Sequence, residues 1–231
     1  MGSVWTIVVA AGSGTRFGQP KQYQPLGDRR VLDWSLRAAR AASNGVVLVV
    51  PANRAEDPEP EADRIVTGDS TRSGSVRAGL DAVPEDAEIV IVHDGARPLA
   101  SVQLFATVVA AVRDGASAAV PAVPVTDTVR SRTNGLVDRA DLVVVQTPQA
   151  FSAQALRAAH ASGREGTDDG SLVEAMGGKV SLVPGAATNV KITYPTDLLV
   201  AEALLPGSLV EYPPEVLRGA RRQQDQDQAE R

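Results

Sequence analysis

The sequence contains no cysteine and only two histidines among its 231 residues. The absence of cysteine excludes a disulfide framework, a thiolate metal site and a cysteine nucleophile. Two Trp, three Tyr and three Phe are too few for the base-stacking platforms that bind RNA or single-stranded DNA. No run approaches the about 20 apolar residues that span a bilayer, and a strand-like segment begins the chain without a cleavable leader. We therefore expect a cytoplasmic protein with neither a nucleic-acid nor a membrane partner.

Positive charge is also scarce in this sequence. The chain carries 23 Lys plus Arg against 28 Asp plus Glu, a formal net charge of −5. Residues 54–64 hold five acidic and two basic side chains, so the remainder of the chain is almost neutral. A DNA-binding or membrane-surface protein needs a basic face, which this balance does not supply. Only three of the basic residues are lysines: Lys21, Lys179 and Lys191.

Short apolar runs alternate with segments of helical periodicity along most of the chain. The runs predict strands at 5–10, 46–50, 64–67, 88–92, 117–125, 142–146 and 180–183, and the periodic segments predict helices at 31–42, 73–83, 101–115 and 152–162. Unbroken Val, Ile and Leu runs are typical of strands that are covered on both faces. The sequence therefore predicts an α/β protein with a Rossmann-like, mostly parallel sheet flanked by helices, in which residues 142–146 form a central strand.

Two segments depart from this alternation, a polar hairpin and a polar C-terminal tail. Asn134-Gly135 lies between strand-like runs and predicts a two-residue type I′ turn. In that register one face of the hairpin carries Thr128, Arg130, Arg132, Val137, Arg139 and Asp141, with Arg130 opposite Arg139. We expect residues 126–141 to protrude from the sheet as an arm that grips a partner subunit or covers a ligand. Residues 206–231 extend beyond a single domain of residues 1–205 and are expected to be disordered from about residue 221.

A glycine-rich turn follows the first predicted strand. It reads Ala10-Ala11-Gly12-Ser13-Gly14-Thr15-Arg16-Phe17-Gly18 and is followed by Pro20-Lys21-Gln22-Tyr23. Glycines in this place let the backbone approach a phosphate, although a tight turn alone explains them nearly as well. The spacing G-x-G-x-x-x-G is one residue longer than the dinucleotide fingerprint, and no Gly-Lys-Ser/Thr follows as in a P-loop. Arg16 and Lys21 favour the phosphate interpretation, because a triphosphate and its transition state require fixed cations.

Asp94 comes directly after His93, at the end of the predicted strand at 88–92. Ligands of open α/β sheets bind at this edge, and a carboxylate there suits Mg²⁺ carried on nucleotide phosphates. A cap on the next helix or an ion pair with Arg97 explains Asp94 equally well. Of the two histidines, His93 is expected to be neutral and hydrogen-bonded in the core, and His160 is expected on the surface of a helix.

Polar residues also gather between the predicted strand at 64–67 and the predicted helix at 73–83. Gly68, Asp69 and Ser75 lie at a place suited to pyrimidine and ribose contacts. Arg72, in the same segment, either binds phosphate or anchors the loop. Lys179 stands beside Gly177-Gly178 and is interpreted as an ordinary turn residue.

Seven blocks of the sequence, in order, resemble one known family. The first block, with Pro20-Lys21-Gln22-Tyr23, resembles the signature loop of sugar-phosphate nucleotidyltransferases and, within them, the 2-C-methyl-D-erythritol 4-phosphate cytidylyltransferase family of isoprenoid-precursor synthesis. The blocks that continue this resemblance are Thr71-Arg72-Ser73-Gly74-Ser75-Val76-Arg77-Ala78-Gly79-Leu80, His93-Asp94-Gly95-Ala96-Arg97-Pro98, Pro124-Val125-Thr126-Asp127-Thr128, Gln146-Thr147-Pro148-Gln149-Ala150-Phe151, Thr167-Asp168-Asp169-Gly170-Ser171-Leu172 and Asn189-Val190-Lys191-Ile192-Thr193 with Asp197-Leu198. The sequence departs from the family at Asp69, where the family usually has Gly.

The resemblance implies Mg²⁺-dependent transfer of CMP from CTP to 2-C-methyl-D-erythritol 4-phosphate, with release of pyrophosphate. It implies a homodimer in which the hairpin arm reaches the partner subunit. The residues implied to bind CTP are Ala10, Ala11, Gly12, Ser13, Gly14, Gly68, Asp69, Ser75, Asp94 and Gly95, with Asp94 holding the metal. Those implied to bind the sugar phosphate are Arg97, Thr128, Arg139, Thr167 and Lys191, and those implied to stabilise the reacting groups are Arg16, Lys21, Arg139 and Lys191.

Three other functions remain open on the sequence. The nearest is a ribitol 5-phosphate cytidylyltransferase, which has a similar loop and sheet; Gly95-Ala96 before Arg97 favours the methylerythritol enzyme only weakly. An NAD-binding oxidoreductase is disfavoured by the glycine spacing. A non-catalytic nucleotide-binding protein would keep the same fold without turnover.

Overall fold

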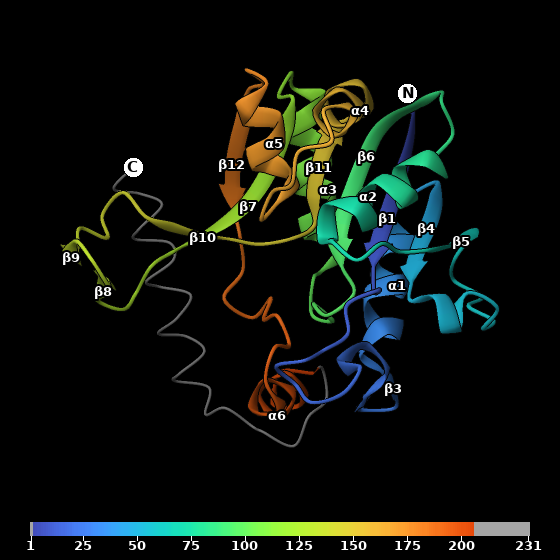
Figure 1. The fold of residues 1–231 in the computed structure, drawn as a ribbon, viewed down its shortest axis with the longest axis horizontal. Coiled ribbons are helices and arrows are strands. Elements are labelled where there is room, and N and C mark those ends of the chain that lie inside the picture. The colour runs from blue at the N-terminus through green and yellow to red at the C-terminus, as the bar shows by residue number, and fades with distance from the viewer. Residues whose placement is uncertain (1, 206–231) are drawn as a thin grey trace.

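An eight-stranded sheet forms the centre of the computed structural model, which describes residues 2–205 (Figure 1). The strand order is β10-β7-β11-β6-β1-β4-β5, and β12 also pairs with β7. The strands are β1 (Ser3–Val9), β4 (Gly45–Val50), β5 (Arg64–Thr67), β6 (Ala87–Asp94), β7 (Ala118–Pro124), β10 (Val143–Val145), β11 (Gln149–Ser152) and β12 (Val180–Pro184). Strands β1, β4, β5 and β6 pair in parallel, as do β7 and β12, which confirms the predicted fold class.

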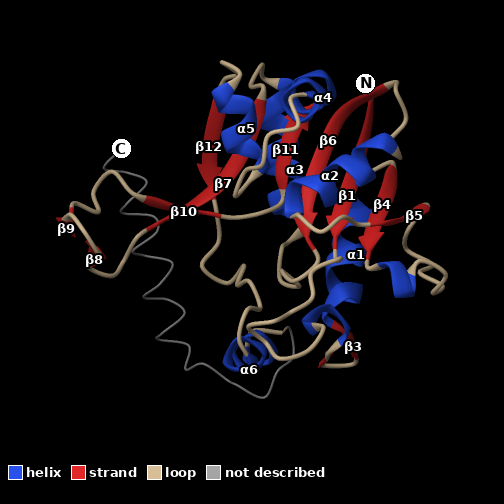
Figure 2. Ribbon diagram, in the orientation of Figure 1, coloured by secondary structure: helices blue, strands red, loops and turns tan. Residues whose placement is uncertain are grey.

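Helices cover both faces of this sheet (Figure 2). The helices are α1 (Val31–Ala42), α2 (Arg72–Asp81), α3 (Val102–Arg113), α4 (Ala153–Ala161), α5 (Asp169–Ala175) and α6 (Pro195–Ala203). Helices α1 and α3 contribute to one buried cluster, and α2, α4 and α5 contribute to another. Successive residues of β6 alternate between the clusters: Ile89 and Ile91 belong to the first, Val90 and Val92 to the second. This double burial explains why the strands read as continuous apolar runs.

Side-chain caps begin four of the helices. The side chain of Thr71 accepts a hydrogen bond from the Gly74 amide, and Ser101, Ser152 and Asp168 cap α3, α4 and α5 in the same way. Such caps satisfy amides that have no partner inside the helix. Near the glycine-rich loop, the chain also forms two short 3₁₀ turns, Lys21–Tyr23 and Ala52–Arg54, and a small hairpin of β2 (Pro25–Leu26) and β3 (Arg29–Arg30).

One expectation about the strands is wrong, and one strand was not predicted. The segment at 142–146 is not central, because β10 pairs antiparallel with β7 alone and its three valines are 39–51% exposed. A run of valines has the same pattern whether or not a helix covers it, so the sequence could not separate the two cases. Strand β11 was not expected either; it lies between β6 and β7 and runs antiparallel to both.

The arm is present and projects away from the sheet, but its register differs from the prediction (Figure 1). Its strands are β8 (Val129–Ser131) and β9 (Gly135–Val137), and Arg130 pairs with Leu136 rather than with Arg139. A type I′ turn needs positive φ at both central residues, whereas among the described residues only glycines have positive φ. The Ser131 hydroxyl instead accepts hydrogen bonds from the Thr133 and Asn134 amides, which widens the turn. The predicted common face is therefore wrong, since Val137 pairs with Val129 and not with Arg132.

The remaining expectations concern the membrane and the C-terminal end. None of the helices within residues 2–205 is both long and apolar enough to cross a membrane. The extension of residues 206–231, with its expected disorder from about 221, lies outside the described residues.

Candidate active site at the carboxyl edge of the sheet

Strands β1 and β6 are parallel neighbours that end at the same edge of the sheet, with Val9 paired to Asp94. The glycine-rich loop leaves β1 at this edge, and a pocket of about 510 Å³ lies between the loop, the start of α2 and the end of β6. The residues that line it are Val9, Ala11, Gly12, Ser13, Arg16, Lys21, Gln22, Asp69, Ser70, Thr71, Arg72, Ser75, Asp94, Ala96 and Lys191. The volume suits a small ligand, and the position is the one at which open α/β sheets bind nucleotides.

Asp94 is the buried anion of this pocket, and three cations surround it. Its Oδ2 lies 2.6 Å from Lys191 Nζ and 3.9 Å from Arg97 Nε, and its Oδ1 lies 3.8 Å from Arg72 Nε. Burial opposes its ionisation, yet Lys191, Arg72 and Arg97 hold the pKa of Asp94 well below the usual range. Asp94 is therefore a carboxylate at any pH at which the protein would be assayed.

A hydrogen-bonded frame fixes Asp94 from behind. Its amide donates to Thr147 Oγ1 at 3.0 Å, and the same hydroxyl lies 3.2 Å from Nδ1 of His93. Asn189 donates to the Thr147 carbonyl at 2.9 Å, while its own backbone carbonyl accepts a hydrogen bond from Arg97 at 2.7 Å. Burial lowers the pKa of His93 to about 4, which supports the neutral core role expected for it. The frame joins the blocks around residues 94, 147 and 189, which lie far apart in the sequence.

The glycine-rich loop brings Arg16 and Lys21 to the pocket. Gly14 has φ +68°, and a Cβ there would lie 2.2 Å from the carbonyl oxygen of Gln19, so the loop closes only with glycine at this position. Gln22 donates a hydrogen bond to the Gly12 carbonyl at 3.3 Å and ties the two ends of the loop together. Burial, together with the nearby Lys191 and Arg16, lowers the pKa of Lys21. Three cations from two distant segments thus lie close enough to repel one another, an arrangement that an anionic ligand would stabilise.

The other end of the pocket is built from the segment between β5 and α2. Ser75 Oγ accepts from the Asp69 amide at 3.1 Å and donates to the Thr71 carbonyl at 2.9 Å. A Cβ on Gly68 would lie 2.4 Å from the Cβ of Ala11, so the segment packs directly against the glycine-rich loop. The Asp69 carboxylate accepts from the Ser70 amide at 2.5 Å, and this hydrogen bond lowers the pKa of Asp69. Beside Arg72 at the start of α2, this end offers hydrogen-bonding groups that suit a base and a ribose.

The structure brings together most, but not all, of the predicted site residues. Those that line the pocket are Ala11, Gly12, Ser13, Arg16, Lys21, Asp69, Ser75, Asp94 and Lys191. Ala10, Gly14, Gly68 and Gly95 do not line it; they form the close backbone packing behind its wall. Arg97 is 9% exposed and Thr167 is exposed just before the cap of α5.

Thr128 and Arg139 belong to the arm and are not among the residues that line this pocket. They share a separate hollow of about 520 Å³ with Val129, Leu136, Val137 and Asp138. Arg139 donates a hydrogen bond to the carbonyl of Thr126. Within one chain, therefore, the arm and the cationic pocket are separate surfaces.

Sequence reasoning missed part of the pocket and misplaced one histidine. Val9, Gln22, Ser70, Thr71 and Ala96 line the pocket although none of them was predicted as a site residue, and Arg72 lines it as well as anchoring the segment. The prediction of a surface position for His160 is wrong, because His160 is 3% exposed and contacts the buried Asp169. The helical pattern around His160 contains mostly alanines, which do not distinguish a buried face from an exposed one.

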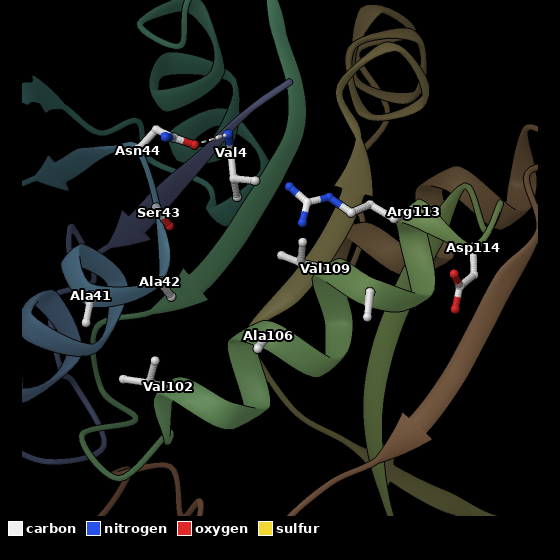
Figure 3. Close-up of a pocket in the computed structure, with 11 residues that line it drawn as sticks. Val4, Ala41, Ala42, Ser43, Asn44, Val102, Ala106, Val109, Arg113 and Asp114 are labelled. Carbon is white, nitrogen blue, oxygen red and sulfur yellow. Dashed lines mark hydrogen bonds between the residues drawn. The ribbon is translucent and has the colours of Figure 1, made fainter. Parts of the chain in front are cut away.

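A second groove of about 600 Å³ lies at the opposite, amino-terminal end of β1, between the C-terminal end of α1 and one face of α3 along its length (Figure 3). Its lining is mainly Val and Ala side chains, with Arg113 and Asp114 at one end. The groove contains none of the predicted site residues. It lacks the cluster of cations that a triphosphate requires, so the pocket beside Asp94 is the candidate active site.

A divalent metal ion fits this pocket only as a companion of the ligand. Within residues 2–205, no cluster of three or more His, Asp or Glu side chains is placed to hold a metal ion. Mg²⁺ in nucleotide sites needs one or two carboxylates and completes its shell with phosphates and water. Asp94 supplies one such carboxylate, and its Oδ1 is beyond hydrogen-bond distance of Arg72. The donor set fits Mg²⁺ that arrives on a nucleotide.

A mostly parallel sheet with a cationic, nucleotide-sized pocket at its carboxyl edge defines a nucleotide-binding α/β protein. Residues 4–206 match the family model of IspD, 2-C-methyl-D-erythritol 4-phosphate cytidylyltransferase. The chain belongs to this family of cytidylyltransferases, which are nucleotidyltransferase enzymes.

Individual relatives agree with this assignment. The chain is 43% identical over 218 residues to the 2-C-methyl-D-erythritol 4-phosphate cytidylyltransferase of Nocardia farcinica, a match that covers 88% of this chain and 94% of the relative. The bifunctional enzyme IspD/IspF of Nitratidesulfovibrio vulgaris is 40% identical over 226 residues, with 86% of this chain but only 57% of the relative covered. The chain thus spans little more than half the length of that bifunctional relative. The crystal structure of the Thermus thermophilus 2-C-methyl-D-erythritol 4-phosphate cytidylyltransferase matches with a TM-score of 0.76 at 38% identity and covers 86% of this chain and 96% of that chain.

Proposed function

We propose that the chain transfers CMP from CTP to 2-C-methyl-D-erythritol 4-phosphate, giving 4-diphosphocytidyl-2-C-methyl-D-erythritol and pyrophosphate. The single domain of residues 1–205 carries this activity in the cytoplasm, with Mg²⁺ bound to the nucleotide. The observation that supports it best is the convergence of Arg16, Lys21 and Lys191 on one pocket beside Asp94. The sugar phosphate in this proposal is the one in the names of the relatives.

The proposed reaction needs positioned charge and no general base. A phosphate oxygen of the sugar phosphate is already ionised, and it attacks the α-phosphorus of CTP in line with the departing pyrophosphate. Arg16 and Lys21 stabilise the negative charge on the pentacoordinate phosphorus and on pyrophosphate, and Lys191 stabilises the α-phosphate oxygens. Asp94 is the residue that would hold Mg²⁺, and the ion would supply neutralisation of the phosphate charge. The transfer step neither takes up nor releases a proton. None of these side chains therefore has to change its protonation state.

The two ends of the pocket orient CTP. The cations Arg16, Lys21 and Lys191 at one end bind the triphosphate. Gly68, Asp69 and Ser75 at the other end contact cytosine and ribose, and the backbone of Ala10, Ala11, Gly12, Ser13, Gly14 and Gly95 shapes the loop and wall between them. In this proposal the α-phosphorus lies next to Lys191.

The sugar phosphate requires cations of its own, because this proposal assigns Arg16, Lys21 and Lys191 to CTP. We propose that Thr128 and Arg139 on the arm of a partner subunit complete the site of a homodimer, together with Arg97 and Thr167. Two features of the arm support this: the shared hollow of Thr128 and Arg139, and the exposed valines of β10 next to it. Exposed apolar surface of this kind is typical of a protein interface.

The test is a turnover assay of the purified chain with CTP, Mg²⁺ and one sugar phosphate at a time. We expect pyrophosphate release with 2-C-methyl-D-erythritol 4-phosphate and little with ribitol 5-phosphate. Preference for ribitol 5-phosphate would reassign the substrate. CTP binding without turnover of either compound would favour a non-catalytic protein, and a thermal shift with NAD but not with CTP would overturn the nucleotide assignment.

A further inference from the structure

Two buried polar side chains and one that is partly exposed connect the interior between α2, α4 and α5 to the pocket wall. Arg72 is the first residue of α2, Asp169 is the first residue of α5, and His160 lies near the end of α4. Arg72 Nη1 donates to Asp169 Oδ2 at 2.8 Å, and His160 Nε2 lies 3.0 Å from Asp169 Oδ1. The side chains of Asp169 and His160 are 0% and 2% exposed, and that of Arg72 is 25% exposed.

Asp169 and Asp94 both attract Arg72, but unequally. Arg72 makes a hydrogen bond to Asp169 at 2.8 Å, whereas its Nε lies 3.8 Å from Asp94 Oδ1. Burial opposes the charge of Arg72, yet Asp169 and Asp94 together raise its pKa above the usual arginine value. A buried carboxylate is stable only with partners, so Asp169 keeps the arginine close. The guanidinium is thus held at the pocket wall by its hydrogen bond to Asp169, and it lies within ion-pair distance of Asp94 but beyond hydrogen-bond distance.

His160 fixes the Asp169 carboxylate in this role. The ring nitrogen that faces a carboxylate carries the proton, so Nε2 donates to Oδ1 while Arg72 donates to Oδ2. Each carboxylate oxygen therefore has its own donor, and the two donors come from different helices. With both oxygens held, Asp169 cannot rotate to follow Arg72 toward the pocket.

We propose that Asp169 is a positioning residue that holds Arg72 at the nucleotide pocket, at 3.8 Å from Asp94, and keeps it out of a direct hydrogen bond with that carboxylate. The proposal rests on the proposed function in one respect, that the pocket binds CTP. Arg72 then serves as a fixed cation for the nucleotide phosphates, and both oxygens of Asp94 stay available to Lys191 and to the bound nucleotide complex. Without Asp169, the arginine would neutralise the carboxylate that the site needs.

The first experiment compares Asp169→Asn with the wild-type protein. The amide keeps the shape of the side chain but removes the charge that attracts Arg72. We expect kcat to fall about 10- to 100-fold, the range found when a group that orients a site residue is removed. We also expect the dissociation constant for CTP, measured by calorimetry, to rise several-fold. The control is Glu165→Gln, because Glu165 pairs with Arg77 of the same helix as Arg72 at 2.7 Å but lines no part of the pocket. Unchanged kcat and CTP affinity in Asp169→Asn would overturn the proposal.

A double-mutant cycle separates positioning from general stability. If Asp169 acts through Arg72, Arg72→Met and the double variant Arg72→Met/Asp169→Asn should have the same kcat and the same CTP affinity within about twofold. A structural role for Asp169 predicts losses that multiply, and that result would refute positioning. Thermal unfolding of every variant shows whether the fold is retained.

His160 provides a second route should Asp169→Asn fail to fold. His160→Gln keeps a donor for Asp169, and His160→Leu removes it. We expect His160→Gln to retain most of the CTP affinity and His160→Leu to weaken it several-fold; equal affinities for the two variants would count against the proposal. The proposed function is judged separately, on wild-type and Glu165→Gln turnover. Failure of both to release pyrophosphate would refute the function, whereas normal turnover with an unaffected Asp169→Asn would refute only the positioning role.

Discussion

Lysine and arginine have different tasks in the candidate site. An ammonium is a compact point charge that approaches a single phosphate oxygen, whereas a guanidinium spreads its donors over a fork. Lys21 and Lys191 line the pocket, and Lys179 lies on an exposed turn outside it. The only three lysines of the chain therefore form a natural comparison of site and surface positions.

The first prediction uses this comparison. We expect Lys21→Ala and Lys191→Ala to lower kcat about 10²- to 10³-fold, as when one donor to a developing charge is removed. Lys21→Arg and Lys191→Arg should also impair turnover, because the charge is kept but the geometry is not. Lys179→Arg is the matched control and should be silent. A folded Lys21→Ala variant with wild-type turnover would remove Lys21 from the mechanism.

The second prediction concerns pH. Burial and the neighbouring Lys191 and Arg16 lower the pKa of Lys21, so its ammonium loses the proton at a lower pH than an ordinary lysine. As pH rises, kcat/KM should therefore fall earlier than a normal lysine would allow. The fall in kcat should lie at higher pH, because bound triphosphate stabilises the ammonium. Rate profiles of the wild type and Lys21→Arg test this, since arginine stays charged; an alkaline fall that is unchanged in Lys21→Arg belongs to another group.

The site residues that the sequence predicts are those whose position near the pocket follows from the residues next to them in the chain. Arg16 and Lys21 follow a glycine turn, and Asp94 ends an apolar strand, so local pattern was enough to place them near the pocket. Arg72 and His160 depend on Asp169, which is 97 residues from one and nine from the other. Contacts between helices of this kind leave no periodic signal, so the sequence left the role of Arg72 open and placed His160 on the surface.

At the scale of elements, the glycine-rich loop is the part most constrained by backbone geometry. A third prediction is that Gly14→Ala lowers kcat/KM at least about tenfold, roughly 1.4 kcal/mol, because a Cβ would meet the Gln19 carbonyl oxygen at 2.2 Å. Gly18 also has a positive φ, +91°, but a Cβ there would meet nothing within 4 Å. Gly18→Ala therefore carries backbone strain without the clash and should be milder in both kcat/KM and thermal unfolding. Equal effects would show that strain alone matters.

Element prediction succeeded where the composition and periodicity of the segment itself are clear. Helix α1 and strand β5 have the predicted bounds, and β1, β4, β6 and β7 differ from prediction by a few residues at most. The four-residue β11 was missed, because its place between β6 and β7 is decided by pairing rather than by its own composition. The arm register failed for a local reason, since the Ser131 hydroxyl offered the turn amides an acceptor that the Asn-Gly rule ignores.

At the scale of the whole molecule, the candidate site is divided between two surfaces. The cationic pocket lies at the carboxyl edge of the sheet, and the hollow with Thr128 and Arg139 lies on an arm that projects away from it (Figure 1). In-line transfer needs the reacting atoms about 3–3.5 Å apart. The arm of one chain therefore serves the pocket of another in the proposed homodimer, where a two-fold axis produces two equivalent sites.

The last prediction tests this sharing directly. Lys21→Ala damages the pocket and Arg139→Ala damages the arm, so each variant alone should be nearly inactive. In a mixed dimer, one site combines both defects, while the other combines an intact pocket with an intact arm. After equal amounts are unfolded and refolded together, half of the dimers should be mixed, and about a quarter of the wild-type activity should return. If the arm serves the pocket of its own chain, every site carries one defect and mixing restores nothing. Sedimentation of the mixture checks that dimers form, and Lys179→Ala mixed with wild type provides the control for losses during refolding.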